Sequence, residues 1–294
     1  NASVGVANDG TAVYKNVGNT DNLAVANNAS DAIVNNTGNI TDAAVSSVNG
    51  GTSSYNNSGN TDNLAVANDN SISQVDNSGN VVNGSVSTVN GGGAQYDNSG
   101  NTDNLAVANN DSLAVVNNTG NVTNGALGTA NEGTSVYNNS GNTTALATAT
   151  NNAASQVNNT GNVDNASVGV ANDGTAVYKN VGNTDNLTVN NNGSNATVNN
   201  TGNIDNAQIT TVTDASSNYN NSGNTGNLDA DISNNGFMKI DNSGNLDNAT
   251  TSTADNSQSI YNNSGNTSNL ASTTTDFSQS RINNTGSFSN AGLF

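Results

Sequence analysis

Residues 11–27 read TAVYKNVGNTDNLAVAN, and this stretch decides the fold. Apolar and polar residues alternate with a period of two on both sides of a short segment, Gly18–Asn22. That period is typical of β-strands, and Gly and Asn tolerate the left-handed backbone of tight turns. We therefore expect a strand, a turn at Gly18–Asn22 and a second strand. One face of this predicted unit carries Ala12, Tyr14, Asn16, Leu23, Val25 and Asn27.

The same unit recurs along all 294 residues. A Gly stands at positions 18, 38, 59, 79, 100, 120, 141, 161, 182, 202, 223, 244, 265 and 286, always 20 or 21 residues apart. A regular spacing of this kind is not expected of a disordered chain. A single coil cannot bury its apolar face alone, but it gains a core when it stacks on copies of itself. Asn stands two positions before every one of these glycines, as Asn16, Asn36, Asn57, Asn77, Asn98, Asn118, Asn139, Asn159, Asn180, Asn200, Asn221, Asn242, Asn263 and Asn284.

A longer period of about 41 residues is superimposed on the first. Four positions before the Gly, Tyr alternates with Val or Ile, and five positions after it Leu alternates with Ala or Gly. We expect the large side chains of one rung to lean over the small ones of its neighbours, which brings a thin core to native packing density. The first of these layers is Tyr14, Val34, Tyr55, Val75, Tyr96, Val116, Tyr137, Val157, Tyr178, Val198, Tyr219, Ile240, Tyr261 and Ile282.

These periods predict an all-β fold, a two-sheet parallel β-solenoid of stacked β-arches. It has about 14 rungs of 20–21 residues, alternating between Tyr/Leu and Val/Ala rungs. We expect a single repeat domain over 1–294, with a half rung at 1–9, regular rungs at 10–235 and divergent, Phe-containing rungs at 236–294. The inward Asn row is expected to form a hydrogen-bonded ladder from rung to rung, since an unpartnered buried amide costs about 1–3 kcal/mol.

Composition excludes several functions. About a quarter of the residues are Asn, and the chain has no Pro, Cys, His or Trp. Without His or Cys there is no imidazole base and no thiolate, so we expect no enzyme and no cofactor. Four cations against 22 acids, a net charge of −18, argue against a nucleic-acid partner, and no apolar run reaches the roughly 20 residues of a membrane span.

Calcium binding is an alternative interpretation of the acids in the first turn. Ca²⁺ favours several oxygens from closely spaced carboxylates. Only half of the rungs carry such an acid, and an Asp that bonds to its own turn backbone explains the same pattern. The acids lie three positions after the Gly, as Asp21, Asp62, Asp103, Asp164, Asp185, Asp205 and Asp247.

The two ends of the chain depart from the regular pattern. The chain starts out of phase, and all four Phe lie in its last 58 residues. Two interpretations are open, because these rungs either cap the solenoid weakly or are complementary joints at which subunits add head to tail. The candidate assembly residues are Ala2, Val4, Val6, Phe288, Leu293 and Phe294.

The unit resembles the curlin repeat. Counted from the Asn before the Gly it reads N-x-G-N-x-x-N-[LAG]-x-[VIT]-x-[NTS], against Q-x-G-x-x-N-x-A-x-[LV]-x-Q in curlins. It departs by using Asn for the first amide, by Ser47, Thr88 or Val170 at the second amide, and by its larger number of rungs. The matching positions in the first unit are Asn16, Gly18, Leu23, Val25 and Asn27, with Ala12 and Tyr14 on the flanking strand.

Curlins are secreted bacterial subunits that polymerise into amyloid-like fibres of the biofilm matrix with the help of a nucleator. The resemblance implies the same role here: a secreted structural subunit that polymerises head to tail with itself, outside the cell, at the cell surface or in a biofilm matrix. A nucleator or a secretion accessory protein is the further partner that it implies. A chain that begins with Asn1 fits a mature form whose export signal has been removed. The alternative is a repetitive adhesin stalk or an ice- or glycan-binding solenoid, since regular polar rows can match a repeating ligand.

Overall fold

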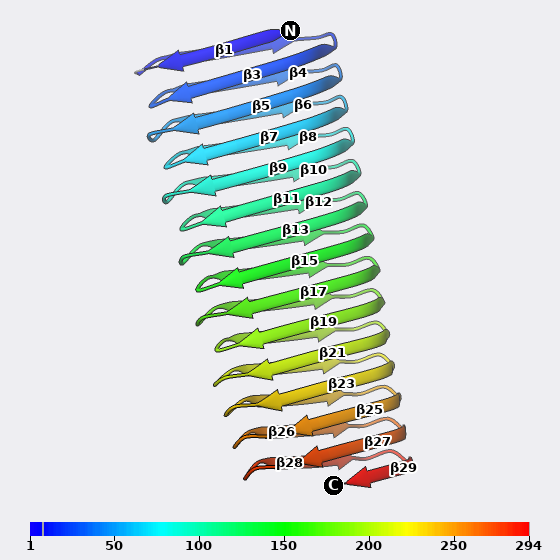
Figure 1. The fold of residues 1–294 in the computed structure, drawn as a ribbon. Helices are drawn as coiled ribbons and strands as arrows, with labels where there is room; N and C mark the ends of the chain where they lie inside the picture. The colour runs from blue at the N-terminus through cyan, green and yellow to red at the C-terminus, as the bar shows by residue number, and fades with distance from the viewer. Residues whose placement is uncertain (8, 294) are drawn as a thin grey trace. The chain divides into compact units, whose positions relative to one another are not determined.

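The computed structural model describes residues 1–7 and 9–293, which contain 29 β-strands and no helix. The chain divides into two compact units, Asn1–Thr144 and Ala145–Phe294. In each unit the odd-numbered strands form one parallel sheet, sheet A, and the even-numbered strands form a second, sheet B, behind it (Figure 1). The predicted all-β, two-sheet parallel β-solenoid of about fourteen turns is confirmed.

The first unit contains fourteen complete strands. Its sheet A consists of β1 (Ala2–Ala7), β3 (Thr20–Asn28), β5 (Ile40–Val48), β7 (Thr61–Asp69), β9 (Val81–Val89), β11 (Thr102–Asn110) and β13 (Val122–Ala130). Its sheet B consists of β2 (Thr11–Asn16), β4 (Asp31–Asn36), β6 (Thr52–Asn57), β8 (Ile72–Asn77), β10 (Gly93–Asn98), β12 (Leu113–Asn118) and β14 (Thr134–Asn139).

The second unit repeats this arrangement, and β15 (Thr143–Asn151) runs across the division between the two. Sheet A continues with β17 (Val163–Ala171), β19 (Thr184–Asn192), β21 (Ile204–Val212), β23 (Thr225–Ser233), β25 (Leu246–Thr253), β27 (Thr267–Thr274) and β29 (Phe288–Leu293). Sheet B has β16 (Ala154–Asn159), β18 (Thr175–Asn180), β20 (Asn195–Asn200), β22 (Ser216–Asn221), β24 (Phe237–Asn242), β26 (Gln258–Asn263) and β28 (Gln279–Asn284).

The strands pair in register, so equivalent positions of successive rungs lie side by side. Val34 is paired with Tyr14 on one side and with Tyr55 on the other. In sheet A, Leu23 is paired with Ala43. A side chain added at Gly84 would meet Leu105 Cδ1 at 3.3 Å. The large side chains of the odd rungs therefore occupy the space that the small residues of the even rungs leave, and six of the seven tyrosines are fully buried.

The first turn is shorter than expected, and its glycine has a different role. The sheet A strands begin at Thr20 or its equivalent, so only three residues separate the two strands of a rung there. The glycine is not in the left-handed region at any of these positions. A Cβ on Gly100 would lie under 3.0 Å from the carbonyl group of Gly79. The same close approach recurs at Gly38, Gly59, Gly79, Gly120, Gly141, Gly182, Gly202, Gly223, Gly244, Gly265 and Gly286. Glycine is required because adjacent arches approach closely, not because of its backbone angles.

Left-handed backbone is instead confined to the second turn, between sheet A and sheet B. Asn49, Asn90 and Asp173 have φ values of 57°, 55° and 62°, and Gly50 has 83°. Asn, Asp and Gly tolerate this conformation best. The NDG and NGG segments suit this turn where they occur, and in other rungs Ala29, Thr213 and Phe277 adopt the same left-handed backbone.

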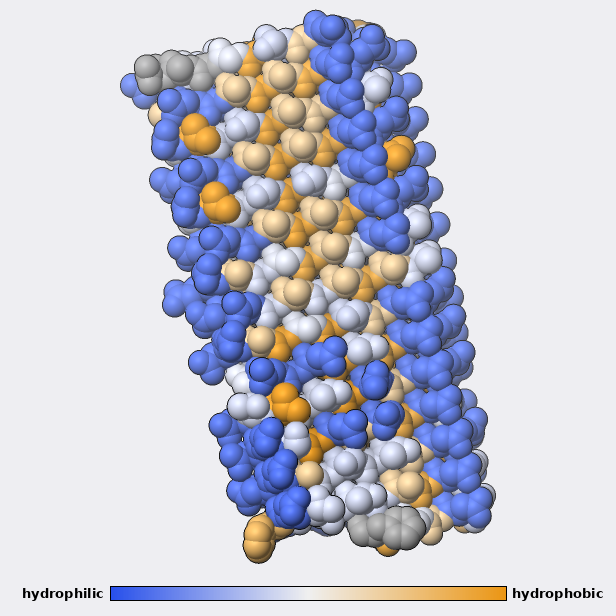
Figure 2. Space-filling model, viewed as in Figure 1, coloured by the Kyte–Doolittle hydropathy of each residue, from blue (hydrophilic) through white to orange (hydrophobic). Residues whose placement is uncertain are grey.

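The outward face of sheet A differs between the units. In the first it carries mostly Ala and Ser, among them Ala24, Ala65 and Ala106, and Figure 2 shows these as a weakly hydrophobic band. In the second, the same rows carry polar and charged residues such as Asp229 and Asp231. Burial, and then the charge of Asp229, raises the pKa of Asp231. This face varies freely because it contributes nothing to the core.

Candidate functional site: the asparagine rows

The inner Asn row consists of the Asn residues two positions before each repeat Gly, at the last residue of every sheet B strand. In the first unit it runs from Asn16 to Asn139, and in the second from Asn159 to Asn284. Apart from Asn16 and Asn284, its members are only 1–4% exposed. The in-register pairing of β-strands about 4.8 Å apart brings each amide within hydrogen-bonding reach of the next.

An inner Asn that has a further rung beside it can use both of its N–H groups. Asn118 Nδ2 donates to Asn139 Oδ1 at 2.8 Å and to the carbonyl oxygen of Gly120 at 2.5 Å. Its Oδ1 accepts from Asn98 Nδ2 at 2.9 Å. In the second unit Asn200 repeats these bonds, to Asn221 at 2.9 Å and to Gly202 at 2.6 Å. The inner Asn row thus joins successive rungs and also closes the first turn, so no buried amide nitrogen is left without an acceptor.

A second inward amide position lies near the second turn but forms no ladder. Asn27, Asn109 and Asn191 alternate there with Ser or Thr. Asn109 Nδ2 donates to the backbone oxygens of Ser112 and Thr134, at 2.8 and 2.7 Å. Because an equivalent amide is missing from the adjacent rungs, these side chains bond to turn backbone instead of to each other.

A buried position that the sequence analysis missed lies two residues after the repeat Gly. Thr20, Thr61 and Thr184 occupy it in odd rungs, whereas Ile or Val occupies most of the even rungs. Two consecutive outward residues follow it, so strict alternation assigns it to the wrong face. The signal in the sequence is its own alternation, Thr wherever the rung carries Tyr and, up to the last rung with its Phe288, an aliphatic residue wherever it carries Val or Ile.

The buried Thr is the partner of the buried Tyr. Tyr55 Oη lies 3.2 Å from Thr61 Oγ1, and Tyr178 Oη lies 3.3 Å from Thr184 Oγ1. Burial raises the pKa of Tyr55 and of Tyr178 to about 12, and the hydrogen bond to Thr offsets part of that effect. The phenols are therefore neutral across the physiological range and serve as packing groups, and the hydroxyls of Tyr55 and Tyr178 each have a Thr partner.

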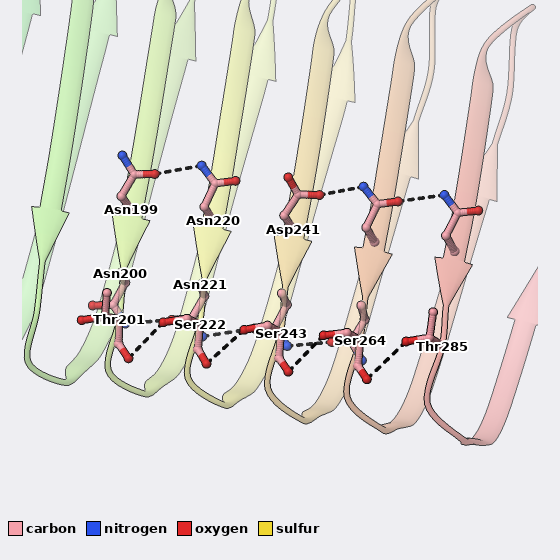
Figure 3. Close-up of a pocket in the computed structure, with 14 residues that line it drawn as sticks. Asn199, Asn200, Thr201, Asn220, Asn221, Ser222, Asp241, Ser243, Ser264 and Thr285 are labelled. Carbon is pink, nitrogen blue, oxygen red and sulfur yellow. Dashed lines mark hydrogen bonds between the residues drawn. The ribbon is translucent and has the colours of Figure 1, made fainter.

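An outer Asn row lies one residue before the inner row and points to solvent. Its members are Lys15, Asn35, Asn56, Asp76, Asp97, Asn117, Asn138, Asn158, Lys179, Asn199, Asn220, Asp241, Asn262 and Asn283. In most rungs the residue just after the sheet B strand is Ser or Thr, and its hydroxyl can donate to the backbone carbonyl oxygen of the equivalent residue in the rung before, as Ser222 does to Thr201 at 3.3 Å (Figure 3). Between these rows a groove of about 620 Å³ runs along β20–β28, and one of about 580 Å³ runs along β4–β12.

The predicted assembly residues lie on the outermost strands. Ala2 and Val4 are half-buried on β1, and the backbone of Val6 pairs with Asn27 of β3. Phe288 and Leu293, on β29, are 40% and 67% exposed. Phe294 lies outside the described residues.

The acids predicted to lie in the first turn are spread along the outside, with no more than one in a rung. Asp21, Asp62 and Asp103 are all exposed. Among residues 1–7 and 9–293, no three acidic side chains come close enough together to hold a metal ion. The same part of the chain contains no helix long and apolar enough to span a bilayer.

In comparisons with known proteins, the chain matches no protein-family model, no curated protein and no solved structure.

Proposed function

We propose that this chain is a structural subunit that polymerises head to tail into an extracellular β-solenoid filament, in a biofilm matrix or at a cell surface. The observation that carries the proposal is the in-register stack of parallel strands, whose outermost strands are paired on one side only. Among the described residues, β1 and β2 have partners only in β3 and β4, and β28 and β29 only in β26 and β27. Exposed, regular edges of this kind are templates for further strands.

The inner Asn row supports a directional joint. Asn284 Nδ2 donates to the carbonyl oxygen of Gly286 at 2.8 Å and, within the described residues, to no further Asn. At the other end, Asn16 donates to Asn36, and its Oδ1 accepts from no described neighbour. Two subunits that meet head to tail would bring the free donor of one against the free acceptor of the other. Two that meet head to head would bring like groups together. The net charge of −18 adds repulsion between filaments, which favours growth along the axis over lateral clumping.

Fibre growth tests the proposal. Purified chain, incubated at rising concentration and followed by light scattering and electron microscopy, is expected to form filaments that give a meridional spacing of about 4.7–4.8 Å in fibre diffraction. Seeds of preformed filament should abolish any lag. A chain that stays monomeric at high concentration, with or without seeds, overturns the proposal.

A matched pair of variants tests the joint. Asn284→Asp removes the terminal N–H donor, whereas Asn283→Asp places the same charge one residue away on the outer surface. We expect seeded growth of the first variant to slow at least tenfold relative to the second. Equal growth rates would exclude the inner Asn row from the joint.

A second candidate, a glycan-binding stalk, is favoured by the polar groove of Figure 3, where amide and hydroxyl oxygens recur once per rung. Monomeric chain should then co-sediment with an insoluble polysaccharide, and Asn220→Ala combined with Asn262→Ala should release it. Co-sedimentation only of preformed filament would point to trapping and against a glycan site.

A further inference from the structure

The outer Asn row has a fixed direction of hydrogen bonding. In its Asn–Asn pairs the amide nitrogen of one rung donates to Oδ1 of the rung before it, as Asn56 does to Asn35 at 2.9 Å and Asn283 to Asn262 at 2.8 Å. The inner Asn row runs in the opposite direction. An Asp in the outer Asn row can therefore accept from the following rung, but its carboxylate has no N–H to give to the preceding one.

Figure 3 shows this interruption at Asp241. Asn262 donates to Asp241 Oδ1 at 2.6 Å, yet no bond links Asp241 to Asn220. A cation compensates here, because Lys239 Nζ lies 2.6 Å from Asp241 Oδ2. Burial alone would raise the pKa of Asp241, but hydrogen bonds from Lys239 and Asn262 and the charge of Lys239 hold that pKa below its usual value.

In the first unit two carboxylates follow one another in the same row. Asp76 of β8 is paired directly with Asp97 of β10, so neighbouring strands about 4.8 Å apart bring two acceptors face to face. Asp97 has both oxygens occupied, Oδ1 by Asn117 Nδ2 at 2.6 Å and Oδ2 by Gln95 Nε2 at 2.7 Å. Asp76 has one long bond, from Gln74 Nε2 at 3.3 Å.

No described cation neutralises this pair. The neighbours of Asp76 are Gln74 on its own strand, Ser54 and Asn56 on β6, and Gln95 and Asp97 on β10. Among these described neighbours, Asp97 is the only charged group. The nearest Lys in the same row is Lys15, three rungs away. Burial, and then the charge of Asp97, raises the pKa of Asp76, and the hydrogen bond from Gln74 offsets part of that effect.

We propose that Asp76 and Asp97 form a proton-binding site in which one proton from solvent converts a repulsive step of the outer Asn row into a hydrogen-bonded one. The proton adds to a carboxylate oxygen of Asp76, whose O–H then donates to the carboxylate of Asp97. The proton is placed on Asp76 because Asn117 and Gln95 already donate to the two carboxylate oxygens of Asp97. The site is a pH-sensitive reinforcement of sheet B in the first unit, and it operates whether or not the chain polymerises.

The sign of the effect follows from linkage. A carboxyl whose pKa is raised in the folded state binds its proton more tightly there than in the unfolded chain. The stabilisation is fully present below the pKa of an unfolded Asp and is lost as the pH rises through the folded pKa of Asp76. Acidification from neutral pH should therefore strengthen the pairing of β8 with β10.

Carbon-13 NMR of the aspartate carboxyl groups, in solution or in the solid state, tests this inference directly. In the native chain the Asp76 carboxyl is expected to titrate above the value of an unfolded Asp. In Asp97→Asn that midpoint should fall, because the like charge is gone and an amide N–H now donates to the Asp76 carboxylate. Asn is the commonest residue of the outer Asn row, so this variant is expected to fold.

Asp103→Asn is the matched control, because it removes one negative charge from the same unit at an exposed position of β11, outside the row. It should leave the Asp76 midpoint unchanged. Backbone amide exchange in β8 and β10, corrected for its intrinsic pH dependence, should slow on acidification in the native chain and in Asp103→Asn but not in Asp97→Asn. An Asp76 midpoint that is the same in Asp97→Asn as in the native chain, or that falls equally in Asp103→Asn, would overturn the proposal.

Discussion

The inner and outer Asn rows are adjacent in sequence and differ in what they tolerate. The inner Asn row is Asn in all fourteen repeats, whereas the outer Asn row also contains Asp76, Asp97, Asp241 and two Lys. Both rows form the same amide bonds with similar lengths, for example 2.9 Å for Asn200 to Asn221 and 2.8 Å for Asn220 to Asn199. What differs is access to water, which can replace a lost partner outside but not inside.

Charging a group in the interior should therefore destabilise the fold more than charging one outside. We expect the largest loss of stability at alkaline pH, where the buried tyrosines ionise. The pKa of Tyr55, Tyr137 and Tyr178 is raised to about 12, against about 10 for tyrosine in an unfolded chain. Their neutral forms stabilise the fold fully below pH 10, and this contribution is lost as the pH rises from about 10 to about 12, at roughly 2–3 kcal/mol for each.

Circular dichroism of the sheet and tyrosinate absorbance, followed together against pH, check this prediction. We expect the strand signal to disappear in the same interval in which the buried phenols ionise. Tyrosinate absorbance that develops near pH 10 with the sheets intact would show that these phenols are open to solvent.

The next largest effect is expected from charging the inner Asn row at one position. Asn200→Asp replaces a donor that serves both Gly202 and Asn221 with a buried acceptor, and we expect a loss of about 3–5 kcal/mol. Asn199→Asp is the control, with the same change one residue away on the outside, and should cost less than about 1 kcal/mol. Denaturant unfolding measures both, and equal losses would refute the distinction between the rows.

Close approach of the arches should make Gly223→Ala costly. Its Cβ would lie under 3.0 Å from the carbonyl group of Gly202, so the backbone of one arch must shift, and we expect a loss of about 1–3 kcal/mol. The matched control is Gly169→Ala, because the nearest atom to its added Cβ would be the backbone oxygen of Thr148, at 3.5 Å. This variant should be neutral or slightly stabilising. Thermal unfolding of both variants is the measurement, and a neutral Gly223→Ala would show that the stack adjusts freely.

The smallest effect is expected in the outer Asn row. Asn220→Ala removes one bond to Asn199 in a position that water reaches, and we expect a change of about 0.5 kcal/mol or less. Truncation of the inner neighbour, Asn221→Ala, should cost at least three times as much, because it removes the donor to the Gly223 carbonyl oxygen and the acceptor for one N–H of Asn200. Similar values for the two in denaturant unfolding would indicate that water enters the first turn.

The parts of the fold and of the candidate site that could be predicted rest on repetition. Tyr14 and Val34 could be assigned to one core layer because in-register strands place equivalent residues side by side. Thr20 was missed because two outward residues, Asp21 and Asn22, break the alternation after it. The role of Gly18 and its equivalents was also misjudged, since sequence shows that a side chain is absent but not what would obstruct one.

The sequence by itself determined the number of rungs, their parallel stacking, the alternating core and the identity of the inner Asn row. It could do so because a strict period exposes every copy of a position to the same surroundings. Only the tertiary structure decided the direction of hydrogen bonding in each row, the contact between successive glycines and the encounter of Asp76 with Asp97. These depend on how the backbone passes through each arch and which atom of one rung meets which atom of the next, and neither follows from the period of the chain.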